Sequence, residues 1–165
     1  PYALHKLIGE QYCELFEKLY NLETFSLRYF NVYGERQPLK GSYALVMGIF
    51  ANQILNSQPI TINGDGEQRR DFIYVDDVVK ANITCSKIAH LKDNTFNIGS
   101  SENYSVNEIA NLLSKTAKRV NNPPVTEPRE TLADINKARK LLNWKPNTIL
   151  RDWVKKYKTD IGLDR

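Results

Sequence analysis

Cysteines are few and long hydrophobic runs are missing from this sequence, and both shortages limit what the chain can be. Cys13 and Cys85 are the two cysteines in 165 residues, and neither has a Cys-x-x-Cys partner or a histidine at a metal-ligand spacing. We therefore expect reduced thiols, without a disulfide or a zinc site. No stretch approaches the roughly 18 apolar residues of a membrane span, and residues 1–10 do not resemble a secretory signal. The expectation is a cytoplasmic protein with no membrane partner.

The composition is that of a globular chain with a modest positive charge. Hydrophobic residues make up 41% and charged residues 25% of the sequence, which is enough apolar material for one core. The net charge is +4, and most of the excess lies after residue 114 on predicted helices, among acidic and apolar neighbours. No basic stripe interleaves with aromatic residues, so we expect no nucleic-acid partner. The charge better suits a small ligand that carries phosphate.

Apolar residues recur with helical and strand periods in alternation. A spacing of three and four residues from Leu4 to Leu19 indicates an amphipathic helix over residues 1–20. Residues 23–32 are rich in aromatic and β-forming side chains and predict a strand. Similar patterns predict strands at 60–62, 71–75 and 95–98, and helices at 43–55, 105–118, 134–142 and 148–157. The expected class is α/β, in one unit over residues 1–165.

Two local patterns predict where helices begin. Ser105 and Glu108 have the spacing of a capping box, in which a hydroxyl and a carboxylate satisfy each other's backbone N–H groups. Asp76 or Asp77 is expected to cap a further helix that follows the strand at 71–75.

Other residues predict turns and packing. Residues 63–66, Asn-Gly-Asp-Gly, predict a turn, and residues 121–124 and 127–128 predict a connection without regular structure. Trp144 and Trp153 are expected to anchor the packing of the last two helices. His90 follows a helix end and needs no role.

Tyr2 and Lys6 are four residues apart on the first predicted helix, so their side chains rise from the same face. A tyrosine phenol ionises only at a pH of about 10, which makes it a poor base near neutrality. A nearby ammonium group favours the phenolate. The pair is therefore a candidate general base with its helper, although an amphipathic helix also carries such pairs on its surface.

Longer motifs place that pair in a known context. In order and spacing, the chain resembles the extended short-chain dehydrogenase/reductase family, and within it the UDP-glucose 4-epimerase-like enzymes. The likeness covers nearly the whole chain. It rests on Pro1-Tyr2-Ala3-Leu4-His5-Lys6, Leu27-Arg28-Tyr29-Phe30-Asn31-Val32-Tyr33-Gly34, Asn63-Gly64-Asp65-Gly66-Glu67-Gln68-Arg69-Arg70-Asp71-Phe72, Phe96-Asn97-Ile98-Gly99-Ser100 and Leu142-Asn143-Trp144-Lys145-Pro146.

The resemblance implies a role for particular residues. Tyr2 matches the catalytic base of the family, and Lys6 matches the lysine that favours its phenolate and bonds the nicotinamide ribose. Tyr29 matches a strand end beside the nicotinamide. Asn31 and Arg70 match residues that reach the diphosphate of the nucleotide, and a guanidinium suits phosphate because its planar fork donates two charge-assisted hydrogen bonds.

Each of these assignments has a purely structural alternative. Arg70 could pair with Asp71 or Asp76 on the surface, and Asn31 could cap a strand end. The glycines of residues 63–66 could serve only to supply positive φ in a hairpin turn.

The chain also departs from the family pattern. The glycine-rich dinucleotide fingerprint is absent from the sequence, and so is the catalytic serine or threonine that precedes the tyrosine. The segment around Arg129 is shorter than the Arg-x-Gly-Asp loop of relatives, so its phosphate contact is an open assignment. We expect a truncated carboxy-terminal portion, with residues 1–38 a remnant of the dinucleotide-binding domain and residues 39–165 mainly the nucleotide-sugar-binding part.

The resemblance implies NAD-dependent epimerisation at C4 of a nucleotide sugar, a UDP-hexose, in the parent enzyme. It also implies a homodimer through the first helix. We expect the isolated chain to be inactive, because most of the NAD site is not encoded in it. Two alternatives stay open, namely a dehydratase or decarboxylase of the same family and a non-catalytic fragment that binds nucleotide sugars.

Overall fold

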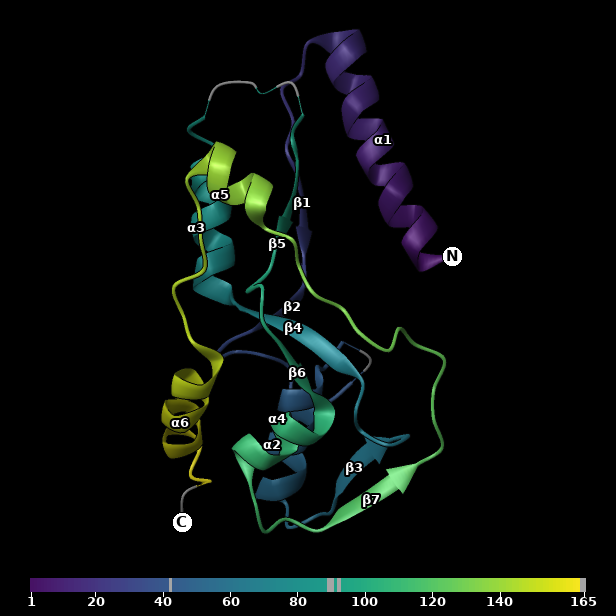
Figure 1. Cartoon of the computed structure of the whole chain (residues 1–165), viewed down its shortest axis with the longest axis vertical. Helices are drawn as coiled ribbons and strands as arrows, with labels where there is room; N and C mark the ends of the chain where they lie inside the picture. Colours follow the sequence, from purple (N-terminus) through teal and green to yellow (C-terminus); the bar gives the residue numbers. More distant parts are fainter. Residues whose placement is uncertain (42, 89–90, 92, 164–165) are drawn as a thin grey trace.

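The structure is a computed structural model that describes residues 1–41, 43–88, 91 and 93–163, and His90 lies outside these residues. Helices and strands alternate along the chain, as the α/β expectation requires (Figure 1). In order they are α1 Tyr2–Tyr20, β1 Ser26–Tyr29, β2 Asn31–Tyr33, α2 Val46–Leu55, β3 Ile60–Asn63, β4 Arg69–Tyr74, α3 Val75–Cys85, β5 Thr95–Ile98, β6 Asn103–Ser105, α4 Val106–Leu113, β7 Arg119–Asn122, α5 Asn136–Leu142 and α6 Leu150–Asp160.

In the part of the chain that the structure describes, the strands form three small sheets in which parallel pairing dominates. β1 pairs with β5, β2 with β4, and β3 with β7, all in parallel, while β6 pairs with β4 in the antiparallel direction. Parallel pairs need crossover connections, and the helices between the strands supply them. This arrangement confirms the α/β class.

The predicted strand at 23–32 is two strands with different partners. Residues 26–29 pair with β5 and residues 31–33 pair with β4, and the change occurs at Phe30. The backbone N–H of Phe30 still reaches the carbonyl of Ile98 at 3.2 Å. The chain therefore stays extended while it leaves one sheet and enters the next, which is why the sequence pattern is continuous there.

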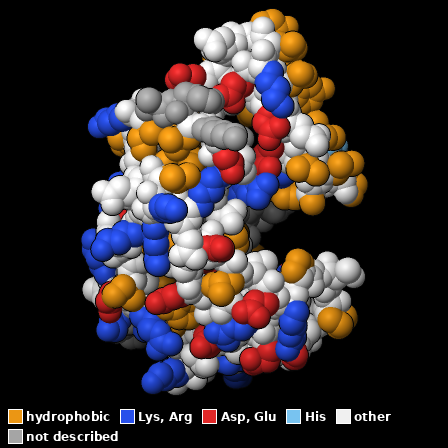
Figure 2. Space-filling view, turned by 45° about the horizontal axis from the view of Figure 1, so that its top comes forward, with side chains coloured by type: hydrophobic (Ala, Val, Ile, Leu, Met, Phe, Trp, Pro, Cys, Tyr) orange, Lys and Arg blue, Asp and Glu red, His pale blue; other side chains and the backbone are white. Residues whose placement is uncertain are grey.

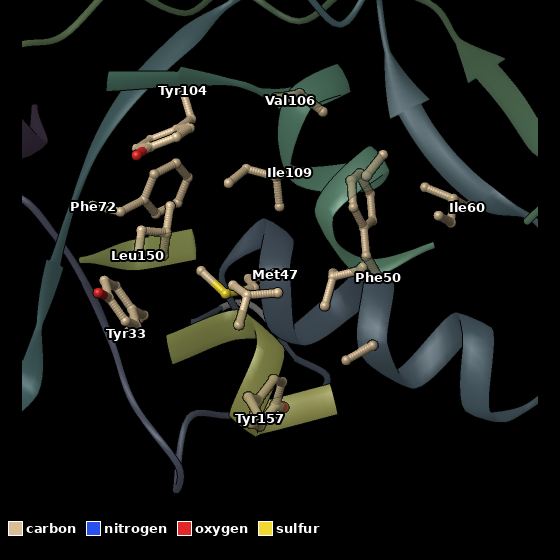
Figure 3. Packing of buried hydrophobic residues seen from close by; sticks show 14 of the residues in the cluster. Tyr33, Met47, Phe50, Ile60, Phe72, Tyr104, Val106, Ile109, Leu150 and Tyr157 are labelled. Carbon is tan, nitrogen blue, oxygen red and sulfur yellow. The ribbon is translucent and has the colours of Figure 1, made fainter. Parts of the chain in front are cut away.

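Two hydrophobic clusters hold these layers together. The first gathers β2, α2, β3, β4, α4 and α6 around side chains such as Tyr33, Met47 and Phe72, and Figure 3 shows them pointing toward one another. The second packs α3 and α5 against β5 and includes Trp144, whose indole N–H donates to the carbonyl of Asp77 at 3.0 Å. Trp153 lies in the first cluster, so both tryptophans anchor packing as predicted.

The carboxylates at the start of α3 do not cap it, contrary to expectation. α3 begins at Val75 with Tyr74 as its N-cap residue, and no side chain accepts a capping bond. Asp77 is fully buried and accepts the backbone N–H groups of Asn147 and Thr148 at 3.0 and 2.9 Å. A contact distant in sequence has taken the place of the local cap.

The capping box of α4 is present, with Ser105 accepting from the Glu108 N–H and the Glu108 carboxylate accepting from the Ser105 N–H. The helix is shorter than predicted, because it ends at Leu113 and the backbone of Ser114 is extended. The Ser114 hydroxyl accepts the N–H groups of Thr116 and Ala117, which turns the chain away from the helix.

Residues 119–122 then form β7, which corrects the expectation that residues 121–124 lack regular structure. β7 is exposed on both faces, so no apolar alternation marked it. The turn at 63–66 is present, with φ of 65° at Gly64 and 74° at Gly66. It does not join a hairpin, because β3 and β4 belong to different sheets.

Candidate functional site

A pocket of about 340 Å³ opens where β2, β3 and β4 meet the start of α2. Asn31 and Arg70, the two residues predicted to reach a diphosphate, both line it. Phe50, Phe72 and Val106 give it an apolar wall. An apolar cavity with a few converging polar groups is the usual form of a small-ligand site.

Arg70 supplies the cation of this pocket from the second position of β4. Its side chain is only 14% exposed, and Nη1 donates to the carbonyl of Arg69 at 2.7 Å. Nη2 lies 2.6 Å from Oε2 of Glu127. Arg70 thus pairs with a residue far along the chain, and neither Asp71 nor Asp76 takes that position.

Asp71 is occupied elsewhere, which explains why it does not compete for Arg70. Its buried carboxylate accepts the N–H groups of Ser100, Ser101 and Ala133, and the hydroxyl of Ser100. These bonds fix β4 against the chain that follows β5. Asp71, the residue that follows Arg70, therefore holds the strand that carries Arg70 in place.

Asn31 stands at the first position of β2, opposite Phe72 in the parallel register. Its Nδ2 donates to the carbonyl of Asp71 at 2.8 Å. An amide group has two N–H donors and an acceptor oxygen, so this bond orients the side chain and leaves it capable of a further contact.

The start of α2 adds a third polar element. Ala44, Leu45 and Val46 line the pocket, and Leu45 is an N-cap residue without a side-chain hydrogen bond to the helix. The first backbone N–H groups of a helix have no partner within it, and its dipole places partial positive charge there. The pocket therefore combines a guanidinium with a helix N-terminus, both of which favour an anion.

Glu127 and Gln68 are site residues that the sequence reasoning missed. Both line the pocket, and Nε2 of Gln68 lies 3.2 Å from Oε1 of Glu127. Gln68 belongs to the segment of residues 63–72 that resembles the family, so the sequence did draw attention to its surroundings. Nothing in the proline-rich sequence around Glu127 indicated that its carboxylate reaches Arg70, because the two are distant in sequence.

Arg129 lies outside this pocket, in an adjoining hollow that shares Asn63, Gln68 and Glu127 with it. Its Nη1 is 2.8 Å from Oδ1 of Asp65. The hydrogen bond from Arg129 lowers the pKa of Asp65 to about 2. Arg129 thus contacts the glycine turn in this structure.

Tyr2 and Lys6 share one face of α1, with Nζ of Lys6 5.4 Å from the centre of the Tyr2 ring. Tyr2 is 75% exposed. Neither residue is among those that line the pocket. Tyr29, at the end of β1, donates its hydroxyl to Oδ1 of Asn82 on α3 at 2.9 Å. The structure brings Asn31 and Arg70 together, and it leaves the tyrosine–lysine pair open to solvent.

α1 extends along one side of the molecule and has no buried residue. A bidentate contact from Arg28 to Glu10, with both bonds at 2.6 Å, ties it to β1. Hydrophobic side chains gather on its outer surface, and a deep hollow separates it from the opposite end of the molecule (Figure 2). The exposed large hydrophobic residues of α1 are Tyr2, Leu4, Leu7, Tyr12, Leu15, Phe16, Leu19 and Tyr20.

Metals and membranes are not indicated by the described residues. Within them, no three His, Cys, Asp or Glu side chains gather closely enough to hold a metal ion. No helix of that same part is both long and apolar enough to cross a bilayer. Cys13 is a half-buried free thiol and Cys85 a buried one.

Comparison with known families identifies the lineage of this chain. Residues 1–99 match the sequence model of the NAD dependent epimerase/dehydratase family. The chain belongs to this family. The matched part of this epimerase/dehydratase chain contains Tyr2, Lys6, Tyr29, Asn31 and Arg70, whereas Arg129 lies beyond it.

Solved structures of epimerases share the fold of this epimerase/dehydratase chain. UDP-glucose 4-epimerase of Thermotoga maritima with UDP-glucose is 37% identical, with a TM-score of 0.88 over 97% of this chain and 53% of that one. UDP-glucuronic acid 4-epimerase of Bacillus cereus, in complex with UDP-glucuronic acid and NAD, is 32% identical with a TM-score of 0.83, over 100% of this chain and 53% of that one.

The family likeness extends to another chemistry. UDP-glucuronic acid decarboxylase 4 of Arabidopsis thaliana is 32% identical over 136 residues, which are 79% of this chain and 30% of that protein. The chain spans about half the length of the curated relatives it matches. The activities and substrates of those whole proteins are therefore proposals for this chain.

Proposed function

We propose that this chain is the nucleotide-sugar-binding portion of an NAD-dependent epimerase that inverts C4 of a UDP-hexose. The observation that carries the proposal is the pocket in which Arg70, Asn31 and the N-terminus of α2 converge. A diphosphate is the part of a nucleotide sugar that such a combination of positive groups recognises.

In this proposal Tyr2 and Lys6 provide the acid–base chemistry. The Tyr2 phenolate takes the proton of the sugar 4-hydroxyl and returns it, and the ammonium of Lys6 favours the phenolate. Arg70 and Asn31 hold the diphosphate meanwhile, so that binding of the non-reacting part keeps the sugar near the base. When bound, NAD supplies the hydride chemistry at C4.

Tyr2 and Lys6 have side chains suited to the nicotinamide ribose, which is one part of NAD. The exposed phenol and ammonium of Tyr2 and Lys6 are suited to hydrogen bonds with the hydroxyls of a nicotinamide ribose. Tyr29, at the end of β1, already donates its hydroxyl to Asn82. The glycine-rich turn for the NAD pyrophosphate is absent from residues 1–165. We therefore propose that the described chain contributes only the nicotinamide side of the cofactor site.

We further propose that α1 forms a homodimer interface. Its exposed apolar stripe is continuous over the length of the helix, and no other described element covers it. Exposed apolar surface of this kind favours association with a second copy.

A decarboxylase is the second candidate, favoured by the Arabidopsis relative named above. A non-catalytic fragment that binds nucleotide sugars is the third. Calorimetric titration of the chain with UDP and with NAD tests the binding part of the proposal. UDP binding that requires Arg70 supports it, whereas no binding of UDP would contradict it. Turnover assays of a parent enzyme that combines this chain with a dinucleotide-binding half then distinguish the epimerase from the decarboxylase. The substrates are UDP-glucose and UDP-glucuronic acid.

A further inference from the structure

Residues 123–128, which we call the strap, connect two fixed points beside the pocket, and Glu127 of the strap lines the pocket. Before the strap, β7 is paired with β3, and the carbonyl of Asn122 accepts the N–H of Gly64 at 3.0 Å. After it, the carbonyl of Arg129 accepts the N–H of Arg69 at 2.8 Å. Within the strap, the backbone makes no hydrogen bond to any described residue. The backbone of the strap is thus held at its ends and not in its middle.

One strap side chain reaches the cation of the pocket. All residues of the strap are exposed, but the carboxylate of Glu127 spans to Nη2 of Arg70 at 2.6 Å and to Nε2 of Gln68 at 3.2 Å. Gln68 is 8% exposed and also donates to the carbonyl of Asn63. A buried amide therefore orients Glu127 toward Arg70.

This contact places the Glu127 carboxylate on the Arg70 guanidinium, which is the pocket group best suited to bind an anion. A carboxylate and a phosphate oxygen make the same kind of charge-assisted bond with a guanidinium. The other amino group of Arg70 is already used by the carbonyl of Arg69. A ligand phosphate that approaches Nη2 must therefore replace Glu127 or accept repulsion from it.

We propose that Glu127 is an internal competitor that determines which ligands the pocket accepts. Its carboxylate occupies Arg70 until a ligand with sufficient negative charge displaces it, and the strap moves away on its two fixed ends. The inference rests on the proposed function for its ligand class, since it names the same pocket, but the competition concerns any anion. Neutral ligands gain nothing from removal of the Glu127 charge.

The test compares Glu127→Gln with the wild-type chain in calorimetric titrations with UDP, pyrophosphate and uridine. Glutamine keeps the shape of the side chain and its acceptor oxygen for Gln68, and it removes the charge. We expect UDP and pyrophosphate to bind Glu127→Gln roughly tenfold more tightly, which corresponds to loss of one competing charge-assisted bond, with uridine unchanged.

Glu130→Gln is the matched control. It makes the same change in net charge three residues away. Glu130 is not among the residues that line the pocket, and its carboxylate accepts from Asn103 at 2.6 Å. An equal gain in both variants would show a general charge effect and overturn the proposal. Thermal unfolding of each variant establishes that it is folded before binding is measured.

The outcomes separate this inference from the proposed function. If the wild-type chain binds UDP and Glu127→Gln binds it no better, the competition is wrong and the nucleotide site stands. If neither binds UDP, the proposed function is wrong, and pyrophosphate then decides the competition alone. Tighter pyrophosphate binding by Glu127→Gln supports the competition, and its absence overturns it.

Discussion

The side-chain amide of Asn31 donates to the carbonyl of Asp71 at 2.8 Å, and so joins the two parallel strands that carry the polar groups of the pocket. The carbonyl that accepts from Asn31 thus belongs to Asp71, the residue that follows Arg70 in the sequence. This hydrogen bond orients the Asn31 amide in the pocket that Arg70 also lines.

Arg70 is expected to contribute more to UDP binding than any other residue of the chain. Hydrogen bonds to charged groups contribute about 1.5 to 3 kcal/mol and neutral ones about 1 kcal/mol, so Arg70→Ala should weaken UDP roughly tenfold to a hundredfold. Asn31→Ala should weaken it less. Arg70→Lys should restore little, because a point charge lacks the planar fork. Calorimetry measures all three. Loss of binding on replacement of Arg36, Arg69 or Arg129, with Arg70→Ala unaffected, would move the diphosphate elsewhere.

The isolated chain is expected to show no epimerase turnover and no measurable NAD affinity. The reason is that the chain carries Tyr2 and Lys6, which we propose to bind the nicotinamide ribose, but no glycine-rich turn to hold the NAD pyrophosphate. A coupled assay with UDP-galactose, and NAD titration followed by quenching of tryptophan fluorescence or by calorimetry, check both parts. Turnover by the purified 165-residue chain would refute this expectation.

Self-association through α1 is expected to depend on its apolar stripe. Leu15 and Phe16 are 45% and 46% exposed, so a charge placed at Leu15 costs nothing in the core but disfavours a dimer. Leu15→Glu should shift sedimentation from dimer toward monomer. Lys18→Gln changes the net charge equally from an exposed polar position and should leave the dimer intact. A wild-type monomer with α1 protected from hydrogen exchange would mean that the helix packs on its own strand.

Acid should destabilise the chain partly through Asp77. Burial alone raises the pKa of Asp77, but the N–H groups of Asn147 and Thr148 and the ammonium of Lys80 outweigh it, and the net pKa is lowered. A carboxyl with a lowered folded pKa contributes stability in full above its unfolded pKa of about 4, and loses it as the pH falls through the folded value. The free energy of unfolding should therefore decrease below about pH 4.

Urea titrations from neutral to acid pH measure this dependence. Asp77→Asn keeps an acceptor for the two N–H groups and removes the charge, so its stability should vary less with pH in the acid range than that of the wild type. Asp76→Asn alters an exposed neighbour and serves as the control. Parallel curves for the wild type and Asp77→Asn would show that Asp77 does not contribute.

The sequence predicted the elements whose causes are local. The Ser105–Glu108 capping box is present because both partners lie within one helical turn, and α1 follows the period of its apolar residues. The likeness of the 27–34 and 63–72 segments to the family also placed Asn31 and Arg70 in a common site, and the two line one pocket.

What the sequence could not predict depends on partners distant along the chain. β7 is exposed on both faces and exists because β3 lies beside it. Asp77 does not cap α3, because its carboxylate accepts the N–H groups of Asn147 and Thr148. Glu127 meets Arg70 across 57 positions of sequence, and only the fold brings them together.

The two hydrophobic clusters alternate along the chain. Cluster residues in 33–72, 104–113 and 150–157 belong to the first, and those in 73–98 and 133–144 belong to the second. No single point in the sequence therefore separates one cluster from the other, and loss of either exposes segments that the other needs. The consequence is cooperativity: the part of the chain from β2 to α6 should unfold in one transition, and a proteolytic cut anywhere between β4 and α5 should release two pieces of which neither retains a complete core.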